Sequence, residues 1–157
     1  MPSVCWHAMK EKMLIRQIER TDIEAVEALW TEAGMTNYAL AGDVAQEIIE
    51  KMTRDLDLFL VGETGGQIVA TVMGTYDGHR GRIKRLAIHH DHRRQGFGQQ
   101  ITDELERRFT KRGIARIRLE VWASNTGAQT FWEEAGYEVQ PDIRYYLRNL
   151  DNSKDPC

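Results

Sequence analysis

The stretch Arg93-Arg-Gln-Gly-Phe-Gly98 combines residue types that suit a phosphorylated ligand, and it lies between an expected strand and an expected helix. Glycine lets the backbone approach a ligand closely. The free N–H groups at a helix N-terminus, with the positive end of the helix dipole, favour an anion such as pyrophosphate. The surrounding residues 79–118 have a large excess of Lys and Arg over Asp and Glu, which attracts the same kind of ligand.

Two common phosphate-binding motifs do not fit this turn. A P-loop needs Gly-Lys followed by Ser or Thr, and a dinucleotide fingerprint needs Gly or Ala where this chain has Ile101. A nucleic acid would match the positive charge, but the basic segment has only Phe97 and Phe109 as aromatic residues for base stacking. A small phosphorylated cofactor, a nucleic-acid surface and a plain tight turn are therefore the open interpretations.

The elements before the turn follow from hydrophobic periodicity. Residues 13–18 are typical of a strand, and Thr21-Asp-Ile-Glu24 has the spacing of a capping box that begins a helix. Apolar residues at every fourth position predict a second helix over residues 43–53. Three antiparallel strands joined by glycine-containing turns are expected next, over residues 58–63, 67–76 and 82–88.

The elements after the turn indicate a crossover that returns parallel. Apolar residues at every fourth position predict a helix that ends at Gly113. Residues 114–121 are typical of a strand, and a strand–helix–strand unit normally gives two parallel neighbours. A helix after Asn125 completes the expected helices, and two short strands should follow it, over residues 137–139 and 143–147.

Two motifs occur in order along the chain. Leu86-Ala-Ile88 is followed, after four residues, by Arg93-x-x-Gly96-x-Gly98, and later comes Asn125-x-x-Ala128-x-x-Phe131-Trp-Glu-Glu-Ala-Gly136-Tyr. Together they resemble the GNAT superfamily of acyl-CoA-dependent N-acetyltransferases, over residues 13–150. The resemblance implies a single α+β domain. Its mostly antiparallel mixed sheet would have a central splayed parallel strand pair, and about four helices would flank the sheet.

The resemblance also implies where acetyl-CoA binds. The pantetheine arm would lie between the two splayed strands and pair, like a partial extra strand, with the backbone of Leu86, Ala87 and Ile88. Asn125 would contact the arm or the phosphates. The turn residues that the resemblance assigns to the cofactor are Arg93, Arg94, Gln95, Gly96, Phe97, Gly98 and Gln99.

The implied reaction is direct attack of an amine on the acetyl thioester in a ternary complex. It needs a neutral amine, stabilisation of the oxyanion and a proton for the leaving thiolate. The backbone N–H groups of Ala87 and Ile88 suit the oxyanion. Glu120 is the candidate base, and the alternative for it is a surface ion pair with Arg85 or Arg118.

The proton donor is where this chain departs from the family. The usual tyrosine of the last helix is replaced by Trp132, whose indole cannot supply that proton, and we expect Trp132 to pack in the core. Bulk water or another tyrosine must replace it, with Tyr137 as the candidate and Tyr145 and Tyr146 as alternatives.

The histidines and the acidic helices bear on other ligands. His89-His90-Asp91-His92 offers metal-binding residue types, but consecutive residues on a short loop converge poorly on one ion and the reaction needs no metal, so none is expected. Acids gather on the first two helices, which in the family flank the acceptor side, and they favour a cationic amine: Glu24, Glu27, Glu32, Asp43, Glu47 and Glu50.

The composition excludes other classes of protein. The chain is 41% hydrophobic and 29% charged, with a net charge of −3, as in globular domains. No apolar run is long enough to cross a bilayer or to act as a signal peptide. Cys5 and Cys157 lie at opposite ends of the chain, which favours two free thiols over a disulfide framework. A cytoplasmic protein is therefore expected.

These observations predict a domain plan and a set of partners. Residues 1–12 form an extension that could be disordered, 13–150 the N-acetyltransferase domain and 151–157 a tail, and translation could start at Met1 or Met13. The expected partners are acetyl-CoA and an amine on a small molecule or a protein. A homodimer is open, whereas a membrane or nucleic acid is not expected. The alternative functions are a non-catalytic acyl-CoA sensor and a nucleic-acid-binding module.

Overall fold

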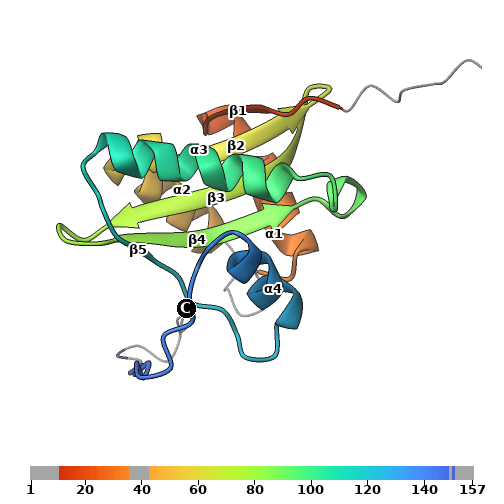
Figure 1. Ribbon diagram of the computed structural model, residues 1–157. Coiled ribbons are helices and arrows are strands. Elements are labelled where there is room, and N and C mark those ends of the chain that lie inside the picture. The colour runs from red at the N-terminus through yellow and green to blue at the C-terminus, as the bar shows by residue number, and fades with distance from the viewer. Residues whose placement is uncertain (1–10, 36–42, 149, 151–157) are drawn as a thin grey trace, which may run out of the picture.

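The computed structural model describes residues 11–35, 43–148 and 150, which form one open sheet with helices on both faces (Figure 1). Nearly all of the expected N-terminal extension and the whole expected tail lie outside the described residues. Five strands lie side by side in chain order, antiparallel except for the last pair: β1 (Leu14–Gln17), β2 (Phe59–Thr64), β3 (Gln67–Tyr76), β4 (Gly81–Ile88) and β5 (Ile117–Arg118).

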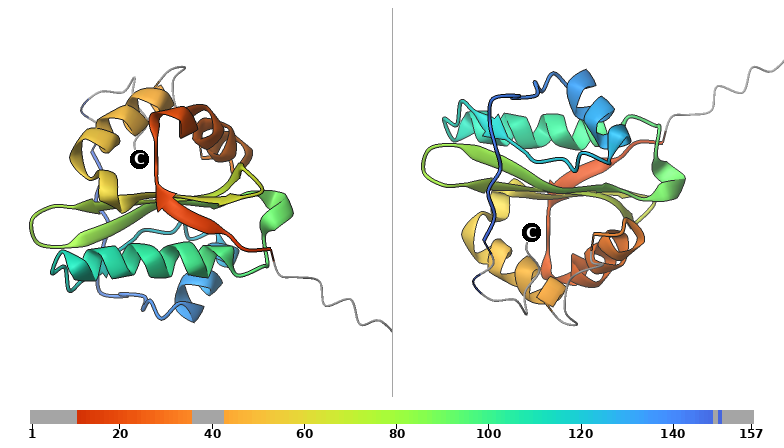
Figure 2. Two further views of the ribbon diagram at one scale, coloured as in Figure 1. Left: turned by 90° about the horizontal axis from the view of Figure 1, so that it is seen from above. Right: turned by 90° about the horizontal axis from the view of Figure 1, so that it is seen from below.

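Two helices cover each face of the sheet (Figure 2). On one face lie α1 (Ile23–Glu32) and α2 (Asp43–Arg54), and on the other lie α3 (Phe97–Lys111) and α4 (Thr126–Glu134). Short 3₁₀ helices precede α1, β2 and α3: η1 (Arg20–Asp22), η2 (Leu56–Leu58) and η3 (His90–His92). This arrangement confirms the predicted α+β fold. No helix in the described part of the chain is long and apolar enough to span a membrane.

Each face of the sheet has its own core, because alternate residues of a strand point to opposite faces. Phe109 of α3 is fully buried, and its ring lies so close to β3 and β4 that a Cβ on Gly74 or Gly81 would stand 2.8 or 2.9 Å from it. On the other face, Trp30 of α1 stacks on Phe59 with ring centroids 6.1 Å apart. On the face of α3, the missing side chains of Gly74 and Gly81 let this helix approach the backbone of β3 and β4.

The start of α1 differs from the predicted capping box. The chain first makes η1, and the side chain of Asp22, not that of Thr21, organises the turn. The Asp22 carboxylate accepts a hydrogen bond from the Glu19 N–H (2.8 Å) and forms an ion pair with Arg16 (2.6 Å). The Arg16 guanidinium lowers the pKa of Asp22 more than burial raises it. A capping box is therefore formed by Glu19 and Asp22 around η1, and not by Thr21 and Glu24 at the start of α1.

Three strand predictions after α3 need correction. The strand expected over residues 114–121 is only Ile117–Arg118, because β5 leaves β4 after two paired positions. The strands expected over 137–139 and 143–147 do not form; the structure describes these residues without regular secondary structure. Val139, Ile143 and Tyr146 are 70%, 67% and 88% exposed. Their apolar side chains have no sheet face to cover, so no packing favours strand pairing there.

Candidate functional site

The turn before α3 leaves the first N–H groups of this helix without a cap. Gly96 is the N-cap residue with φ 83°, and no side chain caps the helix. The first bond back to the turn runs from the Gln100 N–H to the Gly96 oxygen (3.1 Å), so the N–H groups of Phe97 and Gly98 precede it. Arg94, with φ 63°, has no side-chain partner among the described residues. These groups can all reach an anion.

Other side chains of the turn fasten it to its surroundings. Arg93 Nε donates to the backbone oxygen of Ile88 at the end of β4 (3.0 Å), and the Gln95 amide donates to a backbone oxygen of η3 (3.4 Å). Gln99 Nε2 donates to Asp103 Oδ1 one turn further along α3 (2.6 Å). These three side chains position the turn, and Arg93 would have to release Ile88 before it could contact a phosphate.

The end of β4, the start of α3 and α4 meet at one point. A Cβ on Gly98 would lie 3.1 Å from Cε2 of Phe131 in α4 and 3.8 Å from Cγ1 of Ile88. Asn125 is the N-cap residue of α4, and its Oδ1 accepts from the Ala128 N–H (3.0 Å). The Asn125 side-chain NH₂ makes no hydrogen bond within the described chain. The two motifs, far apart in the sequence, therefore lie side by side in the structure.

β4 and β5 part at their C-terminal ends, as predicted for the splayed pair. They pair in parallel only at Gly81 with Ile117 and at Arg82 with Arg118. β4 then continues to Ile88, while no further strand residue of β5 follows in the described chain. The second half of β4 therefore has a backbone edge that faces the departing chain without a strand partner.

The direction of the β4 amides corrects one detail of the expected oxyanion site. The His89 N–H donates to the Val69 oxygen of β3 (2.8 Å). Because successive N–H groups of a strand point to opposite edges, the Ala87 N–H also faces β3, and the Ile88 N–H faces the parted edge. Only Ile88 of the predicted pair can donate there. The backbone of Leu86, two residues earlier, shares this orientation.

A bulge in β4 places Arg85 under α1 and α2. The register between β3 and β4 shifts between Thr71 and Met73, and Arg85 has a positive φ of 55°. Its guanidinium donates to the Met35 backbone oxygen (2.6 Å) and to Glu47 Oε2 (2.8 Å), and it lies over the Trp30 ring at 4.7 Å. Arg85 therefore holds the bulge against both helices and is not a partner of Glu120.

Glu120 forms an ion pair, but with Arg82 rather than with either arginine named from the sequence. Arg82 Nε and Nη2 both contact Glu120 Oε2 at 2.7 Å, which leaves Oε1 without a partner in the described part of the chain. Gly81 and Ile83 face α3, so Arg82 projects to the face covered by α1 and α2. Glu120 reaches that face too, with 37% of its side chain exposed.

Trp132 and Tyr137 belong to the core beside α4. Trp132 is 8% exposed and packs edge-on against Phe131 and Tyr137, with ring centroids 5.0 Å apart in both pairs. This confirms the expected packing of Trp132. The Tyr137 hydroxyl donates to Glu106 Oε1 (2.6 Å), and burial together with this carboxylate raises the pKa of the phenol. Both effects oppose release of a proton from Tyr137.

Ion pairs neutralise much of the basic segment 79–118. Glu104 of α3 binds two arginines of its own helix, which lowers its pKa to about 2 against the effect of burial. Five arginines of the segment have acidic partners: Arg82, Arg85, Arg107, Arg108 and Arg112. These ion pairs reduce the positive charge that the segment presents to an anionic ligand.

Comparisons with known proteins agree with this geometry. Residues 16–137 match the Acetyltransferase (GNAT) family. An acetyltransferase of Sodalis glossinidius is 34% identical over 131 residues, which are 83% of this chain and 91% of the relative. A crystal structure of a GNAT-family acetyltransferase from Staphylococcus aureus Mu50 has a TM-score of 0.71 at 18% identity, covering 90% of this chain and 95% of that one.

A structure from Clostridium acetobutylicum is described as a predicted acetyltransferase with acetyl-CoA. Its TM-score is 0.67 at 17% identity, covering 86% of this chain and 96% of that one. At this identity the likeness concerns the fold. The family match and the 34% identical relative show more: this chain belongs to the GNAT family and is an acetyltransferase.

Sequence reasoning missed two features of the site. Arg85 interrupts an otherwise apolar strand end, but nothing in the sequence shows that its backbone is left-handed or that it binds Met35 and Glu47. The approach of Glu32 to His90 was also missed, because the two residues are 58 positions apart. The one indication in the sequence was that Arg85 directly follows Lys84, which breaks the alternation of apolar and polar residues in the strand.

Proposed function

We propose that this chain transfers the acetyl group of acetyl-CoA to an amine by direct attack in a ternary complex. The observation that carries the proposal is the unpartnered edge of β4 directly beside the uncapped N-terminus of α3. An acyl-CoA has two parts that match these features. Its peptide-like arm can pair with a strand edge, and its pyrophosphate suits a helix N-terminus. The acetyl-CoA named with the Clostridium structure supports this choice of cosubstrate.

The proposed cofactor site follows the assignment from the resemblance, with roles adjusted to the contacts. The exposed edge of β4 would pair with the arm, the α3 N–H groups and the Arg94 guanidinium would bind pyrophosphate, and the Asn125 NH₂ would contact either. The remaining members position the turn. The full set is Leu86, Ala87, Ile88, Arg93, Arg94, Gln95, Gly96, Phe97, Gly98, Gln99 and Asn125.

The proposed chemistry uses few protein groups. The amine attacks the thioester carbon and passes a proton to Glu120 Oε1, directly or through water, while the Ile88 N–H stabilises the developing oxyanion. Breakage of the C–S bond releases CoA thiolate. Since Tyr137 is engaged by Glu106, the proposal assigns protonation of the thiolate to solvent. Because a thiol has a pKa of about 8.5, its thiolate can leave without protonation by a strong acid.

The acceptor is proposed to be a cationic amine on a small molecule or a protein. Acids of α1 and α2 support this sign, although Glu47 is paired with Arg85 and Glu32 with His90. A hollow of about 150 Å³ between α2 and the sheet offers a recess on this face. Its lining mixes Glu47 and Glu50 with three cations, Lys51, Arg54 and Lys84. The hollow thus presents side chains of both signs, so the support for a cationic acceptor rests on the acids of α1 and α2.

Gly98→Val should weaken acetyl-CoA binding without unfolding the domain. The branched side chain would enter the space between the α3 N-terminus, Phe131 and Ile88, where the contact distances leave no room for it. We expect at least about a tenfold loss of affinity by calorimetry, equal to about 1.4 kcal/mol. Overpacking should cost only about 1–3 kcal/mol of stability. Unchanged affinity in the folded variant would contradict the assignment of this turn to the cofactor.

A panel of amines tests the proposed reaction. The protein is mixed with acetyl-CoA and cationic, neutral or anionic amines, and both the released CoA thiol and the mass of the acceptor are followed. We expect thiol release with an acetylated product, fastest with a cationic amine. Faster turnover of neutral or anionic amines would refute the acceptor charge. Binding of acetyl-CoA without transfer to any amine would refute the amine as acceptor.

A further inference from the structure

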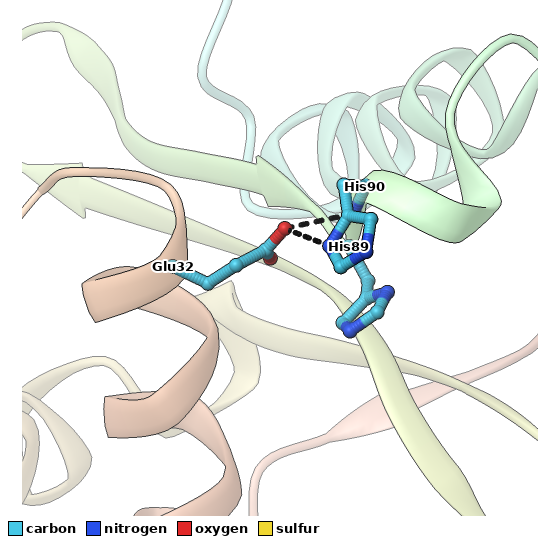
Figure 3. Close-up of side chains that lie close together, drawn as sticks. All are labelled: Glu32, His89 and His90. Atoms are coloured by element: carbon cyan, nitrogen blue, oxygen red, sulfur yellow. Dashed lines mark hydrogen bonds and ion pairs between the residues drawn. The ribbon is translucent and has the colours of Figure 1, made fainter.

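Two histidines and a glutamate meet where α1 ends beside the segment that follows β4 (Figure 3). Glu32 is the last residue of α1, His89 follows β4 and His90 begins η3. One possible ligand atom from each residue lies within 4.8 Å of the others. His89 and His90 are consecutive loop residues, which alone would converge poorly on one ion. The third ligand atom comes from Glu32 at the end of α1, on the other side of the cluster.

The contacts within the cluster hold its members in place. The His90 backbone N–H donates to Glu32 Oε1 (3.1 Å), and His90 Nδ1 contacts the same oxygen. The His89 ring stacks on the His90 ring, with centroids 4.4 Å apart. These contacts hold the Glu32 side chain beside both imidazole rings. The three residues are therefore brought together, and a bound ion would take the place of the direct contact between His90 Nδ1 and Glu32 Oε1.

Asp91 completes the arrangement behind His90. Its Oδ1 lies 3.0 Å from His90 Nε2, on the side of the ring opposite the contact with Glu32. A carboxylate bonded to one imidazole nitrogen orients the other nitrogen toward a metal, as in many carboxylate–histidine–metal sites. His90 Nδ1 is therefore the ligand atom, and Asp91 is its positioning partner.

We infer that Glu32, His89 and His90 bind a divalent transition-metal ion such as Zn²⁺. Two imidazole nitrogens and one carboxylate oxygen suit Zn²⁺, Ni²⁺ or Cu²⁺ better than Mg²⁺ or Ca²⁺, which prefer oxygen ligands. The side chains are 27%, 34% and 58% exposed. Solvent water can therefore complete the coordination shell.

Such an ion would join two parts of the molecule that flank the cofactor turn. Glu32 belongs to α1, whose C-terminal end leads to Met35, the residue that binds Arg85 of β4. His89 and His90 lead directly into the turn before α3. Because the ion binds only the folded arrangement, it should raise the melting temperature of the protein by mass action. This effect does not depend on acetyl transfer.

Calorimetric titration of the full chain with Zn²⁺ tests the inference, with thermal melts as a second readout. Loss of a residue that only hydrogen-bonds to a metal ligand usually lowers metal affinity about 10–100-fold. Glu32→Gln and His90→Ala remove ligand atoms, so each should lower the zinc affinity by at least as much. Each should also abolish the zinc-dependent rise in melting temperature. Asp91→Asn should weaken binding in the same direction. The matched control Glu24→Gln, on the same helix, should bind like the wild type, and Mg²⁺ should leave the melt unchanged.

Metal-free melts of each variant establish that it is folded. Cysteines and histidines outside the cluster can also bind zinc. The test is therefore the difference in zinc affinity and melting shift between the wild type and the variants. The inference is overturned if the wild type binds no zinc, or if its zinc affinity and melting shift survive in both Glu32→Gln and His90→Ala.

Discussion

Glu120→Gln is expected to reduce kcat for acetyl transfer by about 10²–10⁴, the usual contribution of a positioned general base. Oε2 of Glu120 is bound by Arg82, but Oε1 has no partner in the described chain and lies on the face of α1 and α2. The amide preserves the shape of the side chain but cannot accept the proton. The pH profile of kcat/KM should therefore have an acidic limb in the wild type and none in the variant.

Arg82→Gln is the control that separates catalysis from ion pairing. If Glu120 served only as the partner of Arg82, removal of either residue would have the same small effect, since exposed pairs contribute only about 0–1 kcal/mol. The proposal predicts a much smaller rate loss for Arg82→Gln than for Glu120→Gln. Equal rate losses in the two variants would rule out Glu120 as the base.

Phe109→Ala should lower the free energy of unfolding by about 3–5 kcal/mol, a large part of the about 5–15 kcal/mol typical of a domain. The ring is fully buried and lies on the backbone of β3 and β4 at Gly74 and Gly81. No side chain at these glycines can move in to fill the space. Urea unfolding measures the loss, and Thr110→Ala, at the exposed next position, should change stability by less than about 0.5 kcal/mol.

A second substitution tests the contact itself. The three atoms nearest to a Cβ on Gly81 would all belong to the Phe109 ring, at 2.9–3.2 Å, so Gly81→Ala should destabilise the wild type by about 1–3 kcal/mol through overpacking. In the Phe109→Ala background the same methyl enters the cavity and should be neutral or stabilising. Additive effects of the two substitutions would show that α3 does not pack against β4 in this way.

The helices and the turn before α3 could be predicted because local chemistry determines them. Apolar residues at every fourth position indicate α3, and the glycines at 96 and 98 indicate a turn that leads into a helix. The two motifs are far apart in the sequence, yet the structure brings Gly98 to Phe131. The resemblance that rests on these motifs therefore predicted the fold, and its assignment of site residues stays a prediction.

The errors arose where tertiary context decides the outcome. Residues 114–121 alternate apolar and charged side chains, as in a strand, but β5 is short because the chain leaves β4 after Arg118. The direction of each amide in β4 depends on its pairing with β3, which assigns Ile88 and not Ala87 to the parted edge. The left-handed Arg85 and its bonds to Met35 and Glu47 depend on α1 and α2. None of these contacts is local in sequence.

A thermal melt tests whether acetyl-CoA binds at the parted strands and the α3 N-terminus. At about a hundredfold excess of acetyl-CoA over its Kd, the stability of the wild type should increase by about 2.7 kcal/mol, or about 5–10 °C in Tm. Gly98→Val should show a smaller shift at the same concentration. A wild-type protein that is folded and free of ligand, yet shows no shift in millimolar acetyl-CoA, would contradict the account.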